Sequence, residues 1–234
     1  MNKPVLSGSG LADCDYFSLA SPSVQALHPY VPGKPIDELQ RDLGLSDIVK
    51  LASNENPLGL SDKVARAIQS ALKEGARYPD GNGHLLKEAL VGFYGQKNQR
   101  LELNCITLGN GSNDVLELIA RAFIGGSDEV VFSEYAFAVY SIVTQAIGAK
   151  AIEVPAKNWG HDLVAIRKAV TSKTKLIFLA NPNNPTGTAF DKAELIGFMD
   201  SVPNNVLVVL DEAYGEYTKE DAFPGYVKSC APAF

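Results

Sequence analysis

Short apolar runs alternate with longer helical patterns along the chain after residue 104. Runs rich in β-branched and large apolar residues predict five strands, at residues 105–108, 129–132, 151–154, 176–179 and 206–210. Apolar residues at three- and four-residue spacing predict helices between them, at about residues 113–123, 136–147, 162–170 and 191–201. This order is typical of βα units, so the sequence predicts an α/β fold with a mainly parallel sheet.

The pattern within the predicted strands indicates where a ligand-binding site should lie. Residues 176–179 and 206–210 do not alternate with polar residues, so we expect helices on both faces of the sheet. Ligands of such sheets bind beyond the carboxyl ends of the strands. Candidate site residues are therefore expected in the loops after residues 108, 132, 179 and 210.

The chain before residue 104 has a different character. Residues 1–45 carry five prolines with several glycines and serines, which predicts an N-terminal arm. A helix is predicted from residue 62 to about residue 74, capped by Ser61, and another at 84–95. We therefore divide the chain into the arm (1–45), a linking segment with a helix (46–75) and a large domain (76–234).

Composition and charge exclude several classes of function. The net charge is −6 and the pI is about 5.1, which argues against a nucleic-acid partner or an anionic membrane surface. The longest apolar runs have five or six residues, too few to span a bilayer, and the amino end has no apolar signal segment. We expect a cytoplasmic protein. Its cysteines (Cys14, Cys105, Cys230) and its histidines (His28, His84, His161) are scattered, which predicts neither disulfides nor a metal site.

The first candidate motif is the Gly-Asn-Gly-Ser-Asn-Asp segment at residues 109–114, between a predicted strand and a predicted helix. Free N–H groups at the start of a helix suit a phosphate group, and Ser112 adds a hydroxyl. An ordinary helix start is the alternative. A dinucleotide fingerprint is disfavoured, because Asp114 stands where that motif needs a glycine.

The second motif is Asn-Pro-Asn-Asn-Pro-Thr-Gly at residues 181–187, directly after a buried strand. Its prolines and Gly187 restrict the backbone path, so the loop can present the Asn184 amide accurately. The alternative is an ordinary polar turn.

The third motif is Asp-Glu-Ala-Tyr at residues 211–214. A carboxylate at the end of an apolar strand needs a cationic partner, so we expect Asp211 to face positive charge. A nucleotide hydrolase would need a phosphate-binding Gly-Lys-Ser/Thr loop, but Gly33-Lys34 precedes Pro35. A protonated pyridine nitrogen and a solvated strand end remain as alternatives.

Taken in order, these motifs together with Tyr135 resemble the cofactor site of fold-type-I pyridoxal-phosphate aminotransferases. Residues 27–35, 51–59 and 77–80 narrow the resemblance to the histidinol-phosphate aminotransferase family, from about residue 25 onward. The resemblance implies an aspartate-aminotransferase-like large domain, an incomplete small domain, and pyridoxal 5′-phosphate as cofactor.

The resemblance also assigns roles to individual residues. Asp211 would pair with the pyridine nitrogen, Asn184 and Tyr214 would bind the ring's 3-oxygen, and Tyr135 would stack on the ring. The phosphate would be held by Gly111, Ser112 and Asn113 of one subunit and by Tyr78 of the other, which implies a homodimer. Tyr30 and Asn54 would line the substrate pocket.

The implied reaction is amino transfer between L-histidinol phosphate and the 2-oxoglutarate/glutamate pair, in histidine biosynthesis. An aromatic amino acid aminotransferase and a threonine-phosphate decarboxylase of the same fold are alternatives. A hypothesis of another class is a non-catalytic, truncated chain that binds phosphate compounds or pairs with a full-length subunit.

One family feature is missing from the pattern. Family members carry a lysine that binds the cofactor covalently, a few tens of residues after the Asp-x-x-Tyr motif. Lys219 follows Asp211 by only eight residues, and Lys228 precedes a serine rather than following one, so both are expected to be surface residues. We therefore expect the chain to be an amino-terminal portion of a longer aminotransferase, inactive alone.

Overall fold

A computed structural model describes residues 15–30, 33–95 and 101–218 of the 234-residue chain. These residues fall into two compact units. The first unit holds residues 15–29 and 109–218, and the second holds residues 30, 33–95 and 101–108. The division predicted from the sequence, 1–45, 46–75 and 76–234, stays a prediction.

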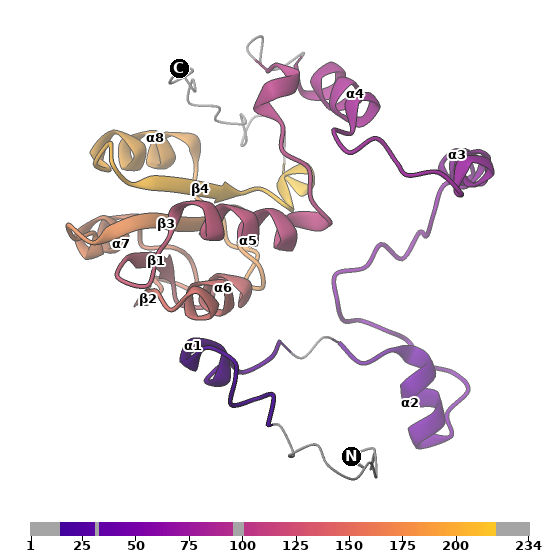
Figure 1. The fold of residues 1–234 in the computed structure, drawn as a ribbon, viewed down its shortest axis with the longest axis horizontal. Coiled ribbons are helices and arrows are strands. Elements are labelled where there is room, and N and C mark those ends of the chain that lie inside the picture. Colours follow the sequence, from indigo (N-terminus) through magenta and orange to yellow (C-terminus); the bar gives the residue numbers. More distant parts are fainter. Residues whose placement is uncertain (1–14, 31–32, 96–100, 219–234) are drawn as a thin grey trace, which may run out of the picture. The chain divides into compact units, whose positions relative to one another are not determined.

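The first unit is built on a four-stranded sheet with the order β2-β1-β3-β4 (Figure 1). Its strands are β1 (Glu129–Ser133), β2 (Lys150–Val154), β3 (Thr174–Ala180) and β4 (Leu207–Asp211). All neighbouring pairs run parallel, with Val131 opposite both Ile152 and Ile177. The predicted α/β fold is confirmed, and these four strands lie within two residues of their predicted bounds.

Helices pack on both faces of this sheet. The first pair is α5 (Gly111–Phe123) and α6 (Val139–Ile147), and the second pair is α7 (Leu163–Ala169) and α8 (Lys192–Ser201). Because strand side chains alternate between faces, Phe132 and Phe178 enter a core with Leu116 of α5 and Tyr140 of α6. The intervening strand residues are equally buried, as are Ile166 of α7 and Leu195 of α8, so the opposite face is covered as well.

Part of the predicted arm packs on the first unit. The short helix α1 (Pro22–Gln25) contacts α6. Ser23 Oγ donates a hydrogen bond to the carbonyl of Ala146 at 3.2 Å, and Gln145 Nε2 donates to the carbonyl of Ala26 at 2.9 Å. Residues 22–26 therefore cover the carboxyl end of α6.

The second unit is helical in its described part. It contains α2 (Ile36–Leu43), α3 (Asp62–Ala71), the 3-10 turn η1 (Leu72–Glu74), α4 (His84–Tyr94) and the 3-10 turn η2 (Leu103–Cys105). The predicted Ser61 cap is confirmed, because Ser61 Oγ accepts a hydrogen bond from the N–H of Val64 at 3.4 Å. The helices predicted at 62–74 and 84–95 are both present.

The strand predicted at residues 105–108 is wrong. Ile106 has extended dihedral angles (φ −111°, ψ 121°), but this segment pairs with no strand in the part of the chain that the structure describes. An apolar run favours an extended backbone, whereas a strand also needs a hydrogen-bonding neighbour.

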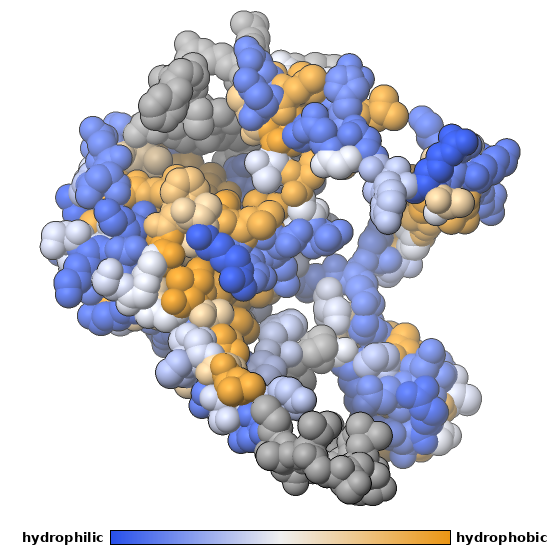
Figure 2. Space-filling view, viewed as in Figure 1, coloured by the Kyte–Doolittle hydropathy of each residue, from blue (hydrophilic) through white to orange (hydrophobic). Residues whose placement is uncertain are grey.

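Apolar side chains are exposed on the helices of the second unit. Val64, Ile68 and Leu72, at helical spacing along α3 and η1, are 45%, 50% and 70% exposed, and Figure 2 shows apolar beside hydrophilic surface at α3. No described helix combines the length and apolar character needed to cross a membrane. Within residues 15–30, 33–95 and 101–218, no three His, Cys, Asp or Glu side chains are grouped to hold a metal ion.

Candidate functional site

A small cavity lies where the carboxyl ends of β3 and β4 meet the start of α5. Its volume is about 50 Å³. It is lined by residues from four segments of the first unit: Ser112, Phe137, Ala180, Pro182, Asn184, Asp211, Ala213 and Tyr214. A space of this size has room for only a few water molecules, so a larger ligand would extend beyond it.

The structure brings four of the predicted site residues to this cavity, although they are up to 102 positions apart in the chain. Ser112 comes from the start of α5, Asn184 from the loop after β3, and Asp211 and Tyr214 from the end of β4 and the turn beyond it. The parallel sheet explains this convergence, because the carboxyl ends of β3 and β4 lie side by side, with Ala180 paired to Asp211.

Asp211 is the last residue of β4 and is half-buried. Its Oδ2 accepts a hydrogen bond from the hydroxyl of Tyr140 at 2.8 Å, and its Oδ1 accepts one from the N–H of Ala213 at 3.1 Å. Within the described residues, no lysine, arginine or histidine forms an ion pair with Asp211. The carboxylate is therefore fixed by neutral donors, and no cation among residues 15–30, 33–95 and 101–218 pairs with it.

The loop at residues 181–187 is held by its own asparagines. Asn181 exchanges two hydrogen bonds with the backbone of Phe190, at 3.0 and 3.1 Å. The N–H of Gly187, whose φ is +69°, donates to the carbonyl of Asn183 at 2.8 Å. This bonding fixes the backbone on both sides of Asn184, as the sequence predicted for a restricted loop.

Asn183 also connects this loop to Tyr135. Its Nδ2 donates to the carbonyl of Tyr135 at 3.0 Å and to Thr186 Oγ1 at 2.8 Å. Tyr135 has a φ of +55°, a left-handed conformation that non-glycine residues rarely adopt. The hydrogen bond from the buried Asn183 stabilises the backbone in this conformation.

The ring of Tyr135 lies outside the lining of the cavity. It is 46% exposed and packs against Trp159, with ring centroids 5.0 Å apart. A hydrogen bond with the Glu134 carboxylate raises the pKa of the Tyr135 hydroxyl. Phe137 and Tyr214 are the aromatic residues that line the cavity, so stacking of Tyr135 on a cofactor stays a prediction.

At the start of α5, the N–H groups of Ser112 and Asn113 have no acceptor within the helix, whereas the N–H of Gly111 donates to the carbonyl of Gly109 at 3.0 Å. The helix begins at Gly111, with a φ of +75°, and its N-cap residue Asn110 makes no side-chain capping bond. The carboxylate of Asp114 turns back to accept from the N–H of Asn110 at 3.0 Å. Ser112 lines the cavity, whereas its chain neighbours Gly111 and Asn113 do not. All three residues are exposed.

Three predicted residues belong to the second unit. Tyr30, Asn54 and Tyr78 are exposed there, Tyr78 completely. Their assignment to a substrate pocket or to a partner subunit stays a prediction. Lys219 and Lys228 lie outside the described residues.

The sequence analysis missed Phe137 and Tyr140. Tyr140 occupies an apolar position of the predicted helix at residues 136–147, and a buried tyrosine hydroxyl requires a hydrogen-bond partner. That requirement was the available signal, although the sequence alone could not identify Asp211 as the partner.

A second half-buried carboxylate, that of Glu212, follows Asp211. Burial raises the pKa of Glu212, and the neighbouring charges of Glu216 and Asp211 raise it further. Its Oε1 is buried without a hydrogen-bond partner among the described residues. Glu212 therefore differs from Asp211, whose two oxygens both accept hydrogen bonds.

Comparison with known proteins shows which family shares this architecture. The family model "Aminotransferase class I and II" matches residues 46–229. A histidinol-phosphate aminotransferase 2 from Pseudomonas fluorescens is 58% identical over 212 residues, which are 90% of this chain and 56% of that protein. A histidinol-phosphate aminotransferase 1 from Idiomarina loihiensis is 55% identical over 211 residues, with the same shares.

A solved structure gives the same result. The histidinol-phosphate aminotransferase from Sinorhizobium meliloti, in complex with pyridoxal-5′-phosphate, matches with a TM-score of 0.78 and 28% sequence identity. The match covers 92% of this chain and 55% of that one. The chain thus spans little more than half the length of the relatives that it matches. On its sequence and on its fold, the chain belongs to the class I and II aminotransferase family.

Proposed function

We propose that this chain forms part of a pyridoxal-phosphate-dependent aminotransferase that transfers an amino group between L-histidinol phosphate and 2-oxoglutarate in histidine biosynthesis. The observation that carries the proposal is the convergence of Ser112, Asn184, Asp211 and Tyr214 on one cavity. The names of the relatives at 55% and 58% identity support histidinol phosphate as substrate.

The donor set of the cavity fits pyridoxal 5′-phosphate. Asp211 presents a fixed carboxylate without a cationic partner among the described residues, which suits a protonated pyridine nitrogen. The start of α5 presents N–H groups that have no acceptor within the helix, together with the Ser112 hydroxyl, and both suit a phosphate. When bound, the cofactor supplies an electron sink for the carbanion that forms as the substrate loses its α-proton.

Each residue has a proposed task. Asp211 holds the proton on the ring nitrogen, because its negative charge favours the pyridinium form. Asn184 donates from its amide and Tyr214 from its hydroxyl to the 3-oxygen of the ring. Tyr135 covers one face of the ring. The phosphate is bound by Gly111, Ser112 and Asn113.

The proposal includes a homodimer of the chain. It also places the protein in the cytoplasm. In this homodimer Tyr78 of one subunit reaches the phosphate held by the other, and Tyr30 and Asn54 contribute to the substrate pocket. The complete exposure of Tyr78 within its own unit supports this assignment, because its hydroxyl is available to a partner. Neither Lys219 nor Lys228 is assigned as the covalent lysine.

Binding of pyridoxamine 5′-phosphate to the 234-residue chain tests the proposal, since this cofactor form needs no covalent lysine. We expect Asp211→Asn to weaken binding, measured by calorimetry, about tenfold or more, because the ion pair with the ring nitrogen is lost. The control is Asp200→Asn, which changes an exposed aspartate of α8 and should bind like the unaltered chain.

Two results would contradict the proposal. The first is an unaltered chain that does not bind pyridoxamine 5′-phosphate, or an Asp211→Asn variant that binds it equally well. The second is an adduct of pyridoxal 5′-phosphate on Lys219 or Lys228 that borohydride reduces to a stable secondary amine. Steady-state rates of the whole enzyme with histidinol phosphate and with phenylalanine distinguish the proposed substrate from an aromatic one.

A further inference from the structure

Tyr140 holds its hydroxyl in a fixed place beneath the candidate site. The side chain is completely buried in α6, and its ring stacks on Phe178 with centroids 4.6 Å apart and planes 9° from parallel. Phe137 packs edge-on at 6.0 Å and Phe132 at 6.4 Å, tilted by 57°. With aromatic rings on three sides, the phenol cannot swing away without opening the core.

The only hydrogen bond that the structure gives this hydroxyl is to Asp211 Oδ2, at 2.8 Å. Burial and the charge of Asp211 both raise the pKa of Tyr140 far above its ordinary value, so the hydroxyl remains a donor. The Tyr140 hydroxyl donates to Oδ2 of Asp211, and the Ala213 N–H donates to Oδ1. These two hydrogen bonds together fix the plane of the Asp211 carboxylate. Each oxygen keeps a second acceptor position, and Asp211 lines the cavity.

We propose that Tyr140 is a positioning residue, whose hydroxyl orients the Asp211 carboxylate toward a protonated nitrogen of a heteroaromatic ligand in the cavity. This inference rests on the proposed function and adds a residue to it. A phenol that donates to a carboxylate stabilises its charged form, and a fixed carboxylate loses less conformational entropy when a ligand binds. Tyr140 itself does not contact the ligand.

Tyr140→Phe tests this role, because it removes the donor and keeps the aromatic ring stacked on Phe178. Calorimetry on the 234-residue chain would compare pyridoxamine 5′-phosphate with its 1-deaza analogue, in which a C–H group replaces the ring nitrogen. We expect the variant to bind pyridoxamine 5′-phosphate about 3- to 10-fold more weakly and the analogue unchanged. A role only in folding would weaken both ligands equally.

Two further variants sharpen the comparison. Tyr16→Phe removes the hydroxyl of a tyrosine that is 80% exposed, and it should bind both ligands like the unaltered chain. In the Asp211→Asn background, Tyr140→Phe should cause no additional loss of selectivity, because both changes act on one interaction. Thermal unfolding monitored by circular dichroism verifies that each variant is folded.

The outcomes separate the inference from the proposed function. If the unaltered chain prefers pyridoxamine 5′-phosphate over the deaza analogue and Tyr140→Phe keeps that preference, the inference is overturned and the proposed function stands. Equal weakening of both ligands by Tyr140→Phe also overturns the inference. If the unaltered chain binds neither ligand, or does not distinguish them, both the inference and the proposed function fail.

Discussion

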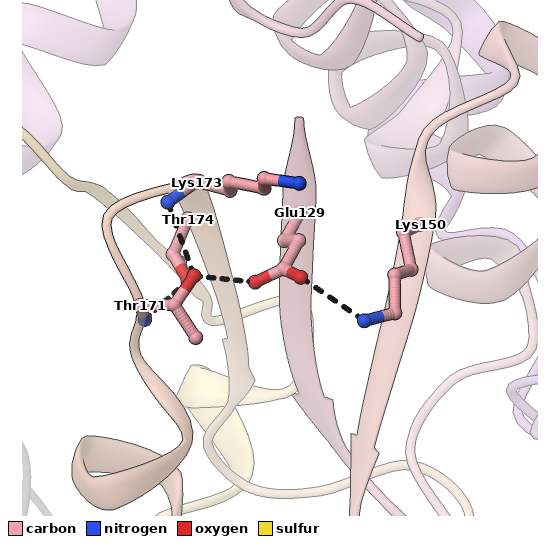
Figure 3. Close-up of polar contacts among 5 residues, drawn as sticks. All are labelled: Glu129, Lys150, Thr171, Lys173 and Thr174. Carbon is pink, nitrogen blue, oxygen red and sulfur yellow. Dashed lines mark hydrogen bonds and ion pairs between the residues drawn. The ribbon is translucent and has the colours of Figure 1, made fainter. Parts of the chain in front are cut away.

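Two acidic residues mark opposite ends of the same sheet and show how partners decide the role of a carboxylate. Glu129 begins β1 and is buried, and it accepts hydrogen bonds from Thr171 Oγ1 at 2.6 Å and from Lys150 Nζ at 3.1 Å (Figure 3). Asp211 ends β4 and, among the described residues, has no cationic partner. The first carboxylate is satisfied within the fold, whereas the second can still bind a cation from outside.

Glu129 should therefore contribute to stability in a pH-dependent way. The Thr171 hydroxyl, followed by Lys150, lowers the pKa of Glu129 below its ordinary value of 4.5, so the folded chain binds this proton less readily than the unfolded chain. The contribution is present above pH 4.5 and is lost as the pH falls through the lower folded-state value. Glu129→Gln should lower the free energy of unfolding at neutral pH by about 1–3 kcal/mol.

Urea unfolding at about pH 7, 5 and 3 measures this effect, and the variant should lose less stability over the acidic interval than the unaltered chain. Glu153→Gln is the matched control, because Glu153 is exposed on the neighbouring strand β2. An identical pH dependence for the Glu129→Gln variant and the unaltered chain would show that the buried carboxylate has no such role.

At the scale of elements, the sequence predicts the bounds of β1 to β4 more closely than it predicts the start of α6. The bounds of β1 and β3 follow from continuous apolar runs, which are buried because both faces of the sheet are covered there. Helix α6 begins at Val139 rather than at residue 136, because the chain turns through Tyr135 with a positive φ. Such a conformation depends on a distant partner, here Asn183, and local pattern cannot indicate it.

The start of α5 is where an element boundary and the proposed site coincide. Gly111 has a φ of +75°, and a Cβ added there meets no atom within 4 Å, so Gly111→Ala would strain the backbone without a steric clash. We expect a loss of about 1 kcal/mol of stability and weaker binding of pyridoxamine 5′-phosphate, since the N–H groups at the start of the helix shift.

Gly197 in the interior of α8 provides the matched control. It also has no atom within 4 Å of an added Cβ, and its φ is not positive. Gly197→Ala should therefore stabilise the chain by about 0.5–1 kcal/mol and leave ligand binding unchanged. Thermal unfolding and calorimetry would measure both variants; equal effects on stability from the two substitutions would refute the role of the positive φ.

At the scale of the whole molecule, the two units differ in how they bury apolar residues. None of the described residues before Leu116 is buried, whereas β3 is buried at six of its seven positions. The sequence predicted the helices of the second unit from periodicity, yet periodicity does not show what covers an apolar stripe. For the same reason it located Ser112, Asn184, Asp211 and Tyr214 by their loops and missed Tyr140, which reaches the site only through packing.

This difference in burial should appear directly in amide hydrogen exchange. Amides of β1 and β3 lie in the core of the first unit, so their exchange requires opening of that core, whereas α2, α3 and α4 open at little cost in buried area. For the dilute chain we expect exchange at residues 129–133 and 174–180 to be at least about a hundredfold slower than at residues 62–71. Mass spectrometry of peptic peptides, normalised to the chain unfolded in urea, measures this ratio.

Raising the chain concentration should then slow exchange in α3 if a second copy covers Val64, Ile68 and Leu72, as the proposed homodimer allows. Slow exchange in α3 at every concentration would contradict the prediction, because it would require the second unit to have a stable core of its own.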